Sequence, residues 1–192
     1  MNELKVYHYT TRLNLSKILR DKTINMSPGF TEMEKSGVWL STNPDFENSA
    51  ASISRSNNNF RLRKESEIKT LGMARIEINT FDVKVFSINQ YKNISRISTR
   101  NFKNLCYFAA QCKADINEWR VSFSPIKLKS WKKIEIYDNQ TRQWKEYKYP
   151  KKDFNELKNT LIKTKEYIEF MDNRQKEKLV LFLNDIKNLI KA

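Results

Sequence analysis

Hydrophobic periodicity changes once along this chain, and the change limits the folds open to it. Up to Tyr149, apolar residues occur in short runs that alternate with polar residues between turn signals, which is typical of strands with intervening helices. From Asp153 onward, apolar residues recur at three- and four-residue steps, which is typical of amphipathic helices. We therefore predict an α+β domain over residues 1–150 and a helical hairpin packed on it over residues 151–192.

The expected elements of the first domain follow from the same patterns. The predicted strands are Lys5–Tyr9, Gly37–Thr42, Gly72–Asn79, Val83–Ile88, Glu118–Ser124, Lys132–Asp138 and Arg142–Tyr149, the last two as a hairpin. The predicted helices are one capped by Asn14, a short one capped by Asn43 or Asp45, and Arg100–Asp115. Ser54–Ser66 has few apolar anchors, which predicts a polar loop.

Positive charge is concentrated in the middle of the chain. The net charge is +14, and residues 51–150 contain 20 basic and 9 acidic side chains. Such a block suits a surface that binds a polyanion, since each neutralised phosphate releases counterions. The alternative is that an AT-rich genome encodes many lysines. Aromatic residues that could stack on unpaired bases, or pack inward, lie among these charges: Trp119, Trp131, Trp144, Tyr147 and Tyr149.

The cysteine and histidine counts exclude the common zinc sites, because one histidine and two cysteines supply too few ligands. Cys106 and Cys112 are six residues apart in a predicted helix and face different sides, which argues against a disulfide between them. No apolar run is long enough to span a membrane, and no signal-peptide pattern follows Met1. We expect a cytoplasmic protein with no membrane partner.

Polar side chains gather at the ends of two predicted strands. His8, the one histidine of the chain, shares a strand face with Thr10, and Asn14 follows where a helix begins. Ser41 and Thr42 end the second strand. Strand ends and helix starts often carry binding sites, so these residues are candidates for one site. The alternative is structural, with a histidine satisfied among tyrosines and an asparagine that is an N-cap.

Two segments carry a resemblance to a known enzyme superfamily. "YHYTTRLNLSKILRDKTI" resembles the opening of NAD-dependent ADP-ribosyltransferases and is most similar to the DNA-modifying toxins of the DarT type. The shared motif is His-x-Thr, an asparagine six residues after the histidine, and L-x-x-I-L, here His8, Thr10, Asn14, Leu15, Ile18 and Leu19. "GVWLSTNP" resembles the second conserved strand of the superfamily, with Trp39, Ser41 and Thr42. "NEWRVSF" resembles the third element, a glutamate at the start of a late strand, which is Glu118.

The resemblance implies a fold and an NAD site. The fold would have the split antiparallel sheets and flanking helices of ADP-ribosyltransferases. NAD would be the co-substrate, and no metal would be required. His8 and Thr10 would hydrogen-bond the adenosine-side ribose, while the backbone of Tyr9 would hold the nicotinamide amide. Tyr9 or Trp39 would stack on the nicotinamide ring. Asn14, Ser41 and Thr42 would complete the edge of the site.

The catalytic groups leave choices open. Glu118 is the candidate carboxylate that stabilises positive charge on the ribose, because it stands at a strand entrance after a helix. Glu77 and Glu135 are rivals, but each alternates with isoleucines as solvent-facing strand residues do. Arg55 is the candidate for the diphosphate, and Arg61 and Arg63 in the same polar segment also qualify.

These features together predict a mono-ADP-ribosyltransferase that modifies a base of DNA or RNA. By analogy, such an enzyme would be a toxin or phage-conflict protein, with an antitoxin or immunity protein as a partner. Enzymatic alternatives are a protein-directed ADP-ribosyltransferase, an NAD glycohydrolase, and an RNA 2′-phosphotransferase. An alternative of another class is a basic nucleic-acid-binding module in which His8 and Glu118 are structural.

Overall fold

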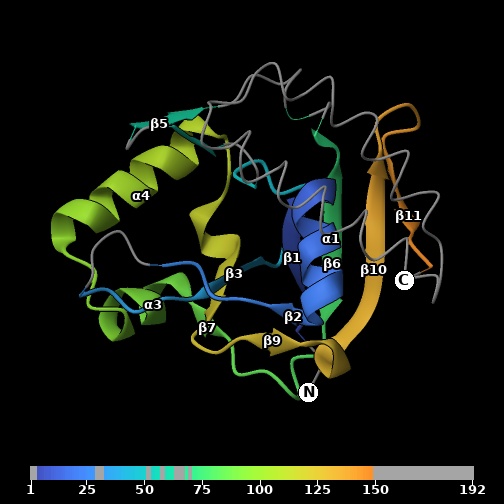
Figure 1. Ribbon diagram of the computed structural model, residues 1–192. Helices are drawn as coiled ribbons and strands as arrows, with labels where there is room; N and C mark the ends of the chain where they lie inside the picture. Colours follow the sequence, from blue (N-terminus) through green and yellow to red (C-terminus); the bar gives the residue numbers. More distant parts are fainter. Residues whose placement is uncertain are drawn as a thin grey trace.

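A seven-stranded sheet with helices on both faces forms the centre of the protein (Figure 1). The computed structural model describes residues 4–28, 33–50, 53–56, 59–62, 68 and 71–148, with the backbone alone for 53–56 and 59–62. Its architecture is mixed α+β, as the periodicity predicts. The helical hairpin expected over 151–192 lies outside the described residues.

The order of the strands across the main sheet differs from their order in the chain. Across the sheet they run β11 (Gln143–Glu146), β10 (Trp131–Asp138), β6 (Met73–Ile78), β1 (Val6–Thr11), β3 (Val38–Ser41), β8 (Trp119–Ser122) and β7 (Phe86–Ser87). Each described pair is antiparallel. The N-terminal strand β1 is therefore central, and it brings an early segment next to strands from the middle and the end of the described chain.

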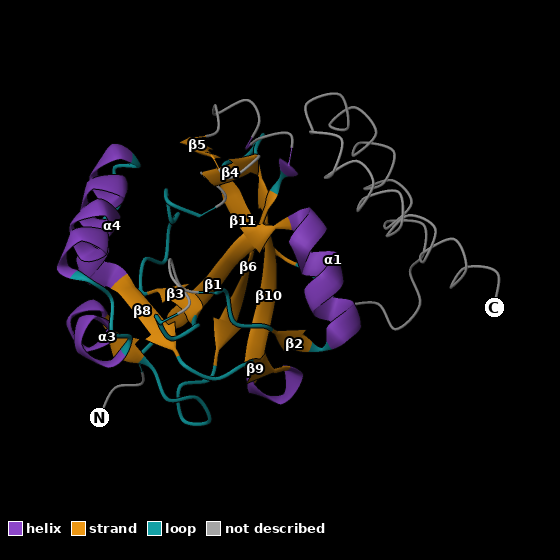
Figure 2. Ribbon diagram, turned by 60° about the vertical axis from the view of Figure 1, so that its left-hand side comes forward, coloured by secondary structure: helices purple, strands orange, loops and turns teal. Residues whose placement is uncertain are grey.

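Two further small sheets and three helices complete the described elements. The small sheets pair β2 (Thr23–Ile24) with β9 (Ile126–Lys127) and β4 (Ile53–Ser56) with β5 (Asn59–Leu62). The helices are α1 (Arg12–Asp21), α3 (Ile88–Ile94) and α4 (Thr99–Gln111), with 3-10 turns at Ile116–Glu118 and Leu128–Ser130. Figure 2 shows α1 on one side of the sheet and α3 and α4 on the other.

Alternation along the strands divides the core into two clusters. On the α1 side, Val6 and Ile76 pack with Leu15 and Leu19 of the helix. On the α3 and α4 side, Trp119 and Val121 pack with helix residues such as Leu105. Successive strand residues point to opposite faces, so β1 sends Val6, His8 and Thr10 toward α1, and Tyr7, Tyr9 and Thr11 toward the other face.

The first helix begins earlier than the sequence indicated, and with a different cap. Thr11, and not Asn14, is the N-cap: its hydroxyl accepts from the backbone N–H of Asn14 at 3.2 Å. Asn14 lies in the first turn and is exposed. Gly72 supports this junction, since its carbonyl accepts from the Arg12 N–H at 3.2 Å and its φ of 63° suits glycine. The prediction of an Asn14 cap was wrong because Thr11, three residues earlier and extended in its backbone, makes the capping bond and the helix begins at Arg12.

Three other predicted segments differ from the structure. Part of the predicted loop Ser54–Ser66 forms the β4–β5 hairpin. The segment after β3 forms a bend and a turn at 48–50 where a short helix was expected. Val83–Ile88 contributes the short strand β7, which pairs with β8 and not with β6, and then gives way to α3. The hairpin β10–β11 and the helix α4 confirm their predictions. Strand β10 and helix α4 each begin one residue earlier than predicted, and β11 and α4 end earlier.

Candidate active site

His8 lies where the central strand meets its neighbour β3. Among the described strand residues, β1 pairs with β6 along six positions but registers with β3 at Tyr7 and Ser41 alone. His8 follows this pair, and its Nδ1 lies 3.0 Å from the backbone carbonyl oxygen of Trp39. A carbonyl can only accept, so Nδ1 carries the proton. The imidazole therefore adds a side-chain bond between the two strands.

Burial keeps the His8 imidazole neutral. Desolvation lowers the pKa of His8 below its usual 6.5, and the bond to the Trp39 carbonyl opposes this by less. In the neutral tautomer with the proton on Nδ1, Nε2 offers a lone pair. No partner for Nε2 is found among the residues that the structure describes. His8 can therefore accept a hydrogen bond from a ligand hydroxyl.

The end of β3 holds the backbone that leads into β8. Thr42 donates twice to the carbonyl oxygen of Glu118, from its backbone N–H at 2.9 Å and from Oγ1 at 3.2 Å. The hydroxyl of Ser41, a fully buried residue, accepts from the Asn43 N–H at 3.1 Å. Thus Thr42 joins the end of β3 to the backbone of Glu118, and Ser41 joins it to Asn43. Both hydroxyl groups make these hydrogen bonds within the protein.

Glu118 stands at the entrance of β8, as predicted, and its carboxylate is held on one side. It is half-buried at the end of the 3-10 turn, and its Oε2 accepts from Nδ2 of Asn43 at 2.9 Å. The other oxygen, Oε1, makes no bond with the described residues. Asn43 is itself fixed, because its Oδ1 accepts from the N–H groups of Asp45 and Phe46 at 2.8 and 3.2 Å.

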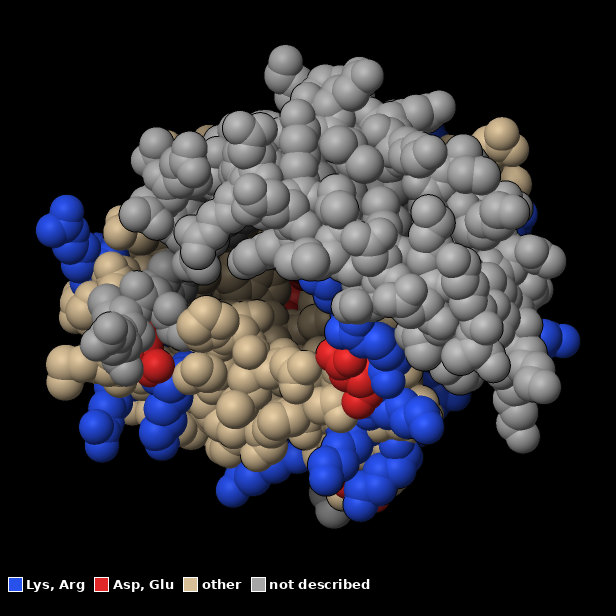
Figure 3. Space-filling model, in the orientation of Figure 1, with Lys and Arg blue, Asp and Glu red and all other residues tan. Residues whose placement is uncertain are grey.

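The register places His8 and Glu118 two strands apart. Tyr7, Ser41 and Trp119 form one row across β1, β3 and β8. His8 follows Tyr7, and Glu118 precedes Trp119 on a strand that runs parallel to β1. Standard strand dimensions then separate their Cα atoms by about 12 Å, a span that a nucleoside could bridge. Figure 3 shows a hollow in the part of the view where Figure 1 draws β1 and β3.

The other predicted cofactor-binding residues have different surroundings. Thr10 is buried opposite Ala74. Trp39 is half-buried, and its ring packs against Tyr91 and Trp119 with centroids 4.9 and 5.8 Å apart. The Tyr9 hydroxyl donates to the carbonyl of Asn43 at 2.6 Å, and burial raises the pKa of Tyr9 to about 12 against the opposing effect of Arg75.

The Arg55 side chain is not among the described residues, so its predicted role stays a prediction. Its backbone pairs with Phe60 in the β4–β5 hairpin. The same holds for Arg61, whose backbone pairs with Ser54, whereas Arg63 lies outside the described residues altogether.

A buried ion pair that sequence reasoning missed lies beside Tyr9. Nε of Arg75 donates to Oε2 of Glu135 at 2.6 Å, and Lys133 donates to Oε1 at 2.7 Å. The Glu135 side chain is 7% exposed, so its interpretation as a solvent-facing strand residue was wrong. Burial raises the pKa of Glu135, but the bonds from Arg75 and Lys133 outweigh it and leave the pKa lowered. The isoleucines on either side of Glu135 indicated that one face of the strand is buried. The face that carries Glu135 is buried as well.

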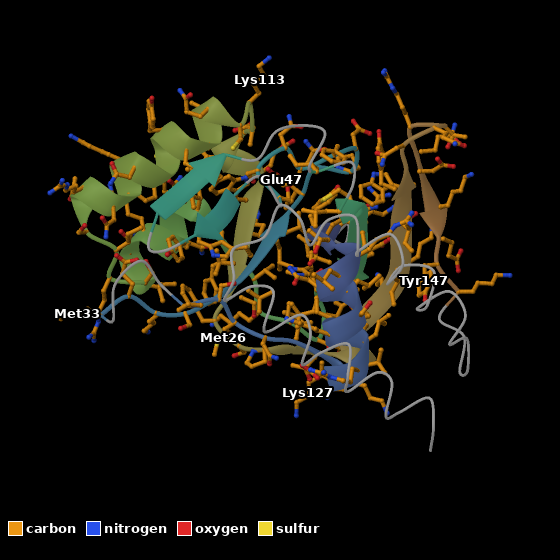
Figure 4. The ribbon with its side chains drawn as sticks, turned by 45° about the horizontal axis from the view of Figure 1, so that its top comes forward. Met26, Met33, Glu47, Lys113, Lys127 and Tyr147 are labelled. Atoms are coloured by element: carbon orange, nitrogen blue, oxygen red, sulfur yellow. The ribbon has the colours of Figure 1, made fainter. Side chains whose placement is uncertain are left out.

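Glu47 is another acidic residue that the sequence did not single out. It is buried on the segment after β3, and its Oε1 accepts from the N–H and the hydroxyl of Ser49 at 3.1 and 2.5 Å. Figure 4 shows Glu47 lying inward, whereas Lys113 at the end of α4 points away from the molecule. The charge of Glu47 contributes to the raised pKa of Tyr9, so Glu47 lies near Tyr9, whose hydroxyl contacts Asn43.

Four of the five aromatic residues singled out in the basic block are described, and these four pack against the protein, whereas Tyr149 lies outside the described residues. Trp119 is buried, and Trp131 and Tyr147 pack on the α1-side core. Trp144 donates its indole N–H to the Asp45 carbonyl and packs on Phe46. Of the two alternatives left open by the sequence, these four aromatic side chains follow the inward-packing one.

Comparisons with other proteins leave the site to be interpreted from its geometry. The described helices are all too short or too polar to cross a membrane. No family model, curated protein or solved structure matches the chain.

Proposed function

We propose that this protein is a mono-ADP-ribosyltransferase that transfers ADP-ribose from NAD to a base of DNA or RNA. The observation that carries the proposal is the convergence of three segments on adjacent strands. His8 comes from β1, Thr42 from the end of β3, and Glu118 from the entrance of β8, more than a hundred positions later. This convergence matches the order of site residues that the resemblance to ADP-ribosyltransferases implies.

Glu118 is suited to the chemistry that such a transfer needs. The glycosidic bond between nicotinamide and ribose C1′ breaks, and nicotinamide leaves with the bonding electron pair. A base nitrogen or oxygen then forms a bond to C1′ and gives up its proton to solvent. Positive charge grows on the ribose between these events, and a fixed carboxylate nearby stabilises it. Oε2 of Glu118 is oriented by Asn43, which leaves Oε1 for the ribose.

His8 is suited to hold a ribose. Its Nδ1–H is used by the Trp39 carbonyl, and neutral Nε2 can accept from a ribose hydroxyl. A protonated imidazole would lose this acceptor. The proposal therefore assigns His8 to substrate binding and not to proton transfer.

The topology suits the split sheet of the ADP-ribosyltransferase fold. The β11–β10–β6–β1 half and the β3–β8–β7 half meet at the Tyr7–Ser41 pair alone among described positions. A sheet that pairs so briefly can open into a groove along the junction, and His8 lies on it. This supports assigning the finer fold, and it would place NAD along the junction.

The basic middle of the chain is the reason to propose a nucleic-acid acceptor. Residues 51–150 have an excess of 11 positive charges, which favours a phosphate backbone over most proteins. Because the four described aromatic residues singled out from the sequence pack inward, we assign recognition to charge and not to base stacking by these four. Modification of nucleic acid harms a cell, so we propose a toxin or phage-conflict role, with an antitoxin or immunity protein as partner.

Incubation with NAD labelled on the adenylate tests this proposal. Wild-type protein, Glu118→Gln and Glu146→Gln would each be mixed with labelled NAD and single-stranded oligonucleotides or lysate proteins. Glu146 is an exposed acid on β11 and provides the matched control. We expect label on oligonucleotide with wild type and Glu146→Gln, and a loss of at least 100-fold with Glu118→Gln, in line with the removal of a transition-state charge partner.

Each alternative has its own outcome. Label on protein alone would reject the nucleic-acid acceptor, and ADP-ribose with free nicotinamide alone would indicate an NAD glycohydrolase. Binding of oligonucleotide without any NAD turnover would favour the non-catalytic binding module.

A further inference from the structure

A line of hydrogen bonds connects the buried ion pair to the candidate carboxylate. Arg75, on β6, donates from Nη1 to the Pro44 carbonyl and reaches the Tyr9 hydroxyl at 3.5 Å. The Tyr9 hydroxyl donates to the Asn43 carbonyl at 2.6 Å. Asn43 then donates from Nδ2 to Glu118 at 2.9 Å. Four contacts thus link β6, β1, the segment after β3, and the entrance of β8.

The starting point of this line is held firmly. The guanidinium of Arg75 lies 4.6 Å from the ring centroid of Tyr7 and 4.5 Å from that of Trp144, so aromatic rings pack against it. Glu135 bonds its Nε, and the two side chains are 10% and 7% exposed. A charge-assisted bond shielded from water keeps a defined geometry. Arg75 can therefore act as an anchor.

The segment at Asn43–Pro44 receives bonds from two directions. Its two carbonyls accept from Tyr9 and Arg75 on the sheet side. Its side-chain oxygen accepts from the Asp45 and Phe46 N–H groups, which makes a tight turn. With backbone and Oδ1 both occupied, the Asn43 amide nitrogen has one direction in which to point, and that direction is toward Glu118.

We infer that Asn43 is a positioning residue for Glu118, and that Tyr9 and Arg75 hold Asn43 in place for this task. The inference rests on the proposed function, since it assigns these residues a part in the same reaction. It also assigns Tyr9 a role other than stacking on nicotinamide, because its hydroxyl and its ring are engaged within the protein.

Kinetics separate positioning from substrate binding. Asn43→Asp keeps the turn acceptor but replaces the amide donor with a carboxylate that repels Glu118. Tyr9→Phe removes two of the four contacts, the one from Arg75 and the one to Asn43, and keeps the ring. We expect kcat for nicotinamide release to fall about 3- to 10-fold in Tyr9→Phe and further in Asn43→Asp, with the KM for NAD nearly unchanged. Tyr137→Phe removes a hydroxyl from the same aromatic cluster without touching the line of bonds, and should keep wild-type kcat.

A second readout does not depend on turnover. The side-chain amide of Asn43 gives an NMR signal pair that the Asn43→Asp spectrum identifies. In Tyr9→Phe and Arg75→Lys this signal should shift, while in Tyr137→Phe it should stay in place. An unshifted signal in both of the first two variants overturns the inference, because Asn43 would then be independent of Tyr9 and Arg75.

The failures of the two proposals differ. If the wild type releases no nicotinamide, the proposed function is wrong, and the catalytic task of Asn43 is wrong with it. If wild type is active and Glu118→Gln is not, while Asn43→Asp and Tyr9→Phe keep wild-type kcat, the positioning role alone is overturned.

Discussion

At the scale of single residues, the fold sets the protonation state of His8. Its Nδ1 proton is committed to the Trp39 carbonyl, and burial disfavours the charged imidazole. A folded-state pKa below that of the unfolded chain means that the unfolded state binds more protons in acid. Stability therefore falls as the pH drops from about 6.5 toward the folded-state pKa, and His8 contributes no slope above that range.

A single histidine makes this testable with one NMR signal. We expect the Hε1 resonance of His8 to titrate with a midpoint below pH 6.5 in the folded protein. In urea the midpoint should lie at about 6.5, the ordinary histidine value. In His8→Gln the slope of unfolding free energy between these two midpoints should be lost. A folded-state midpoint at or above the unfolded one would contradict the placement of His8.

Glu135 gives the opposite experiment in acid. Burial raises the pKa of Glu135, but the bonds from Arg75 and Lys133 lower it by more, so the folded-state pKa lies below the unfolded-state pKa. The Glu135 charge therefore stabilises the fold above the unfolded-state pKa. This stabilisation is lost as the pH falls through the folded-state pKa. Glu135→Gln should cost about 3–5 kcal/mol in urea unfolding at neutral pH, because Arg75 stays buried without its charge partner. The cost should shrink as the pH falls from the ordinary value of 4.5 through the lowered folded-state pKa.

Glu146→Gln is the matched control, since Glu146 is the exposed register partner of Glu135 on β11. An equal, small change in both variants would mean that the ion pair is not buried as described.

Individual residues differ in how far the sequence could predict them. His8 and Glu118 were singled out by a resemblance to a family motif, and the structure places both at the expected strand positions, while their roles stay a prediction. Arg75 and Glu135 were not, because a charged residue between apolar residues has the same pattern whether its face is solvated or covered. Asn43 was read as a helix cap, and its contact with Glu118 depends on a long-range approach.

At the scale of elements, local signals predicted helices and strands better than they predicted pairing. Helix α3 begins with a capping box made by its N-cap Ser87 and by Gln90. The sequence did not reveal this cap because Ser87 lies inside the strand-like run Val83–Ile88. β7 follows β6 in the chain but pairs with β8, and its Phe86 ring packs on Phe123 with centroids 5.4 Å apart. The polar sequence of β4 and β5 gave no periodicity to indicate a hairpin.

The cap of α1 provides a test at this scale. Thr11→Ala removes the acceptor for the Asn14 N–H and should cost about 1 kcal/mol of unfolding free energy. Asn14→Ala changes an exposed side chain within the first turn and should shift stability by less than about 0.5 kcal/mol. The reverse order in thermal or urea unfolding would restore Asn14 as the cap.

At the scale of the whole molecule, the central place of β1 explains how distant segments converge. The long-range register brings Val6–Thr11 between β6 and β3, so one strand serves both halves of the sheet. Periodicity indicates the fold class, but it contains no information on strand order. The charge distribution is also a property of the whole chain. Figure 3 shows basic residues spread along the edges of the described face, which suits an extended polyanion.

Salt dependence tests the proposed nucleic-acid partner at this scale. Affinity for a single-stranded oligonucleotide should fall at least about tenfold between 50 and 200 mM salt, because each neutralised phosphate contributes roughly −0.7 to the slope of log K against log salt. Fluorescence anisotropy with a labelled oligonucleotide measures this, with a neutral-backbone analogue of the same sequence as control. Equal affinity for both would contradict a phosphate-binding surface.

The most direct test of the account is a crystal structure of the Glu118→Gln variant with NAD, since this variant should bind NAD without consuming it. We predict NAD along the β1–β3 junction, with a ribose hydroxyl on Nε2 of His8 and the nicotinamide ribose beside the residue-118 side chain. NAD bound elsewhere, or crystals that take up none at millimolar concentration, would contradict the account.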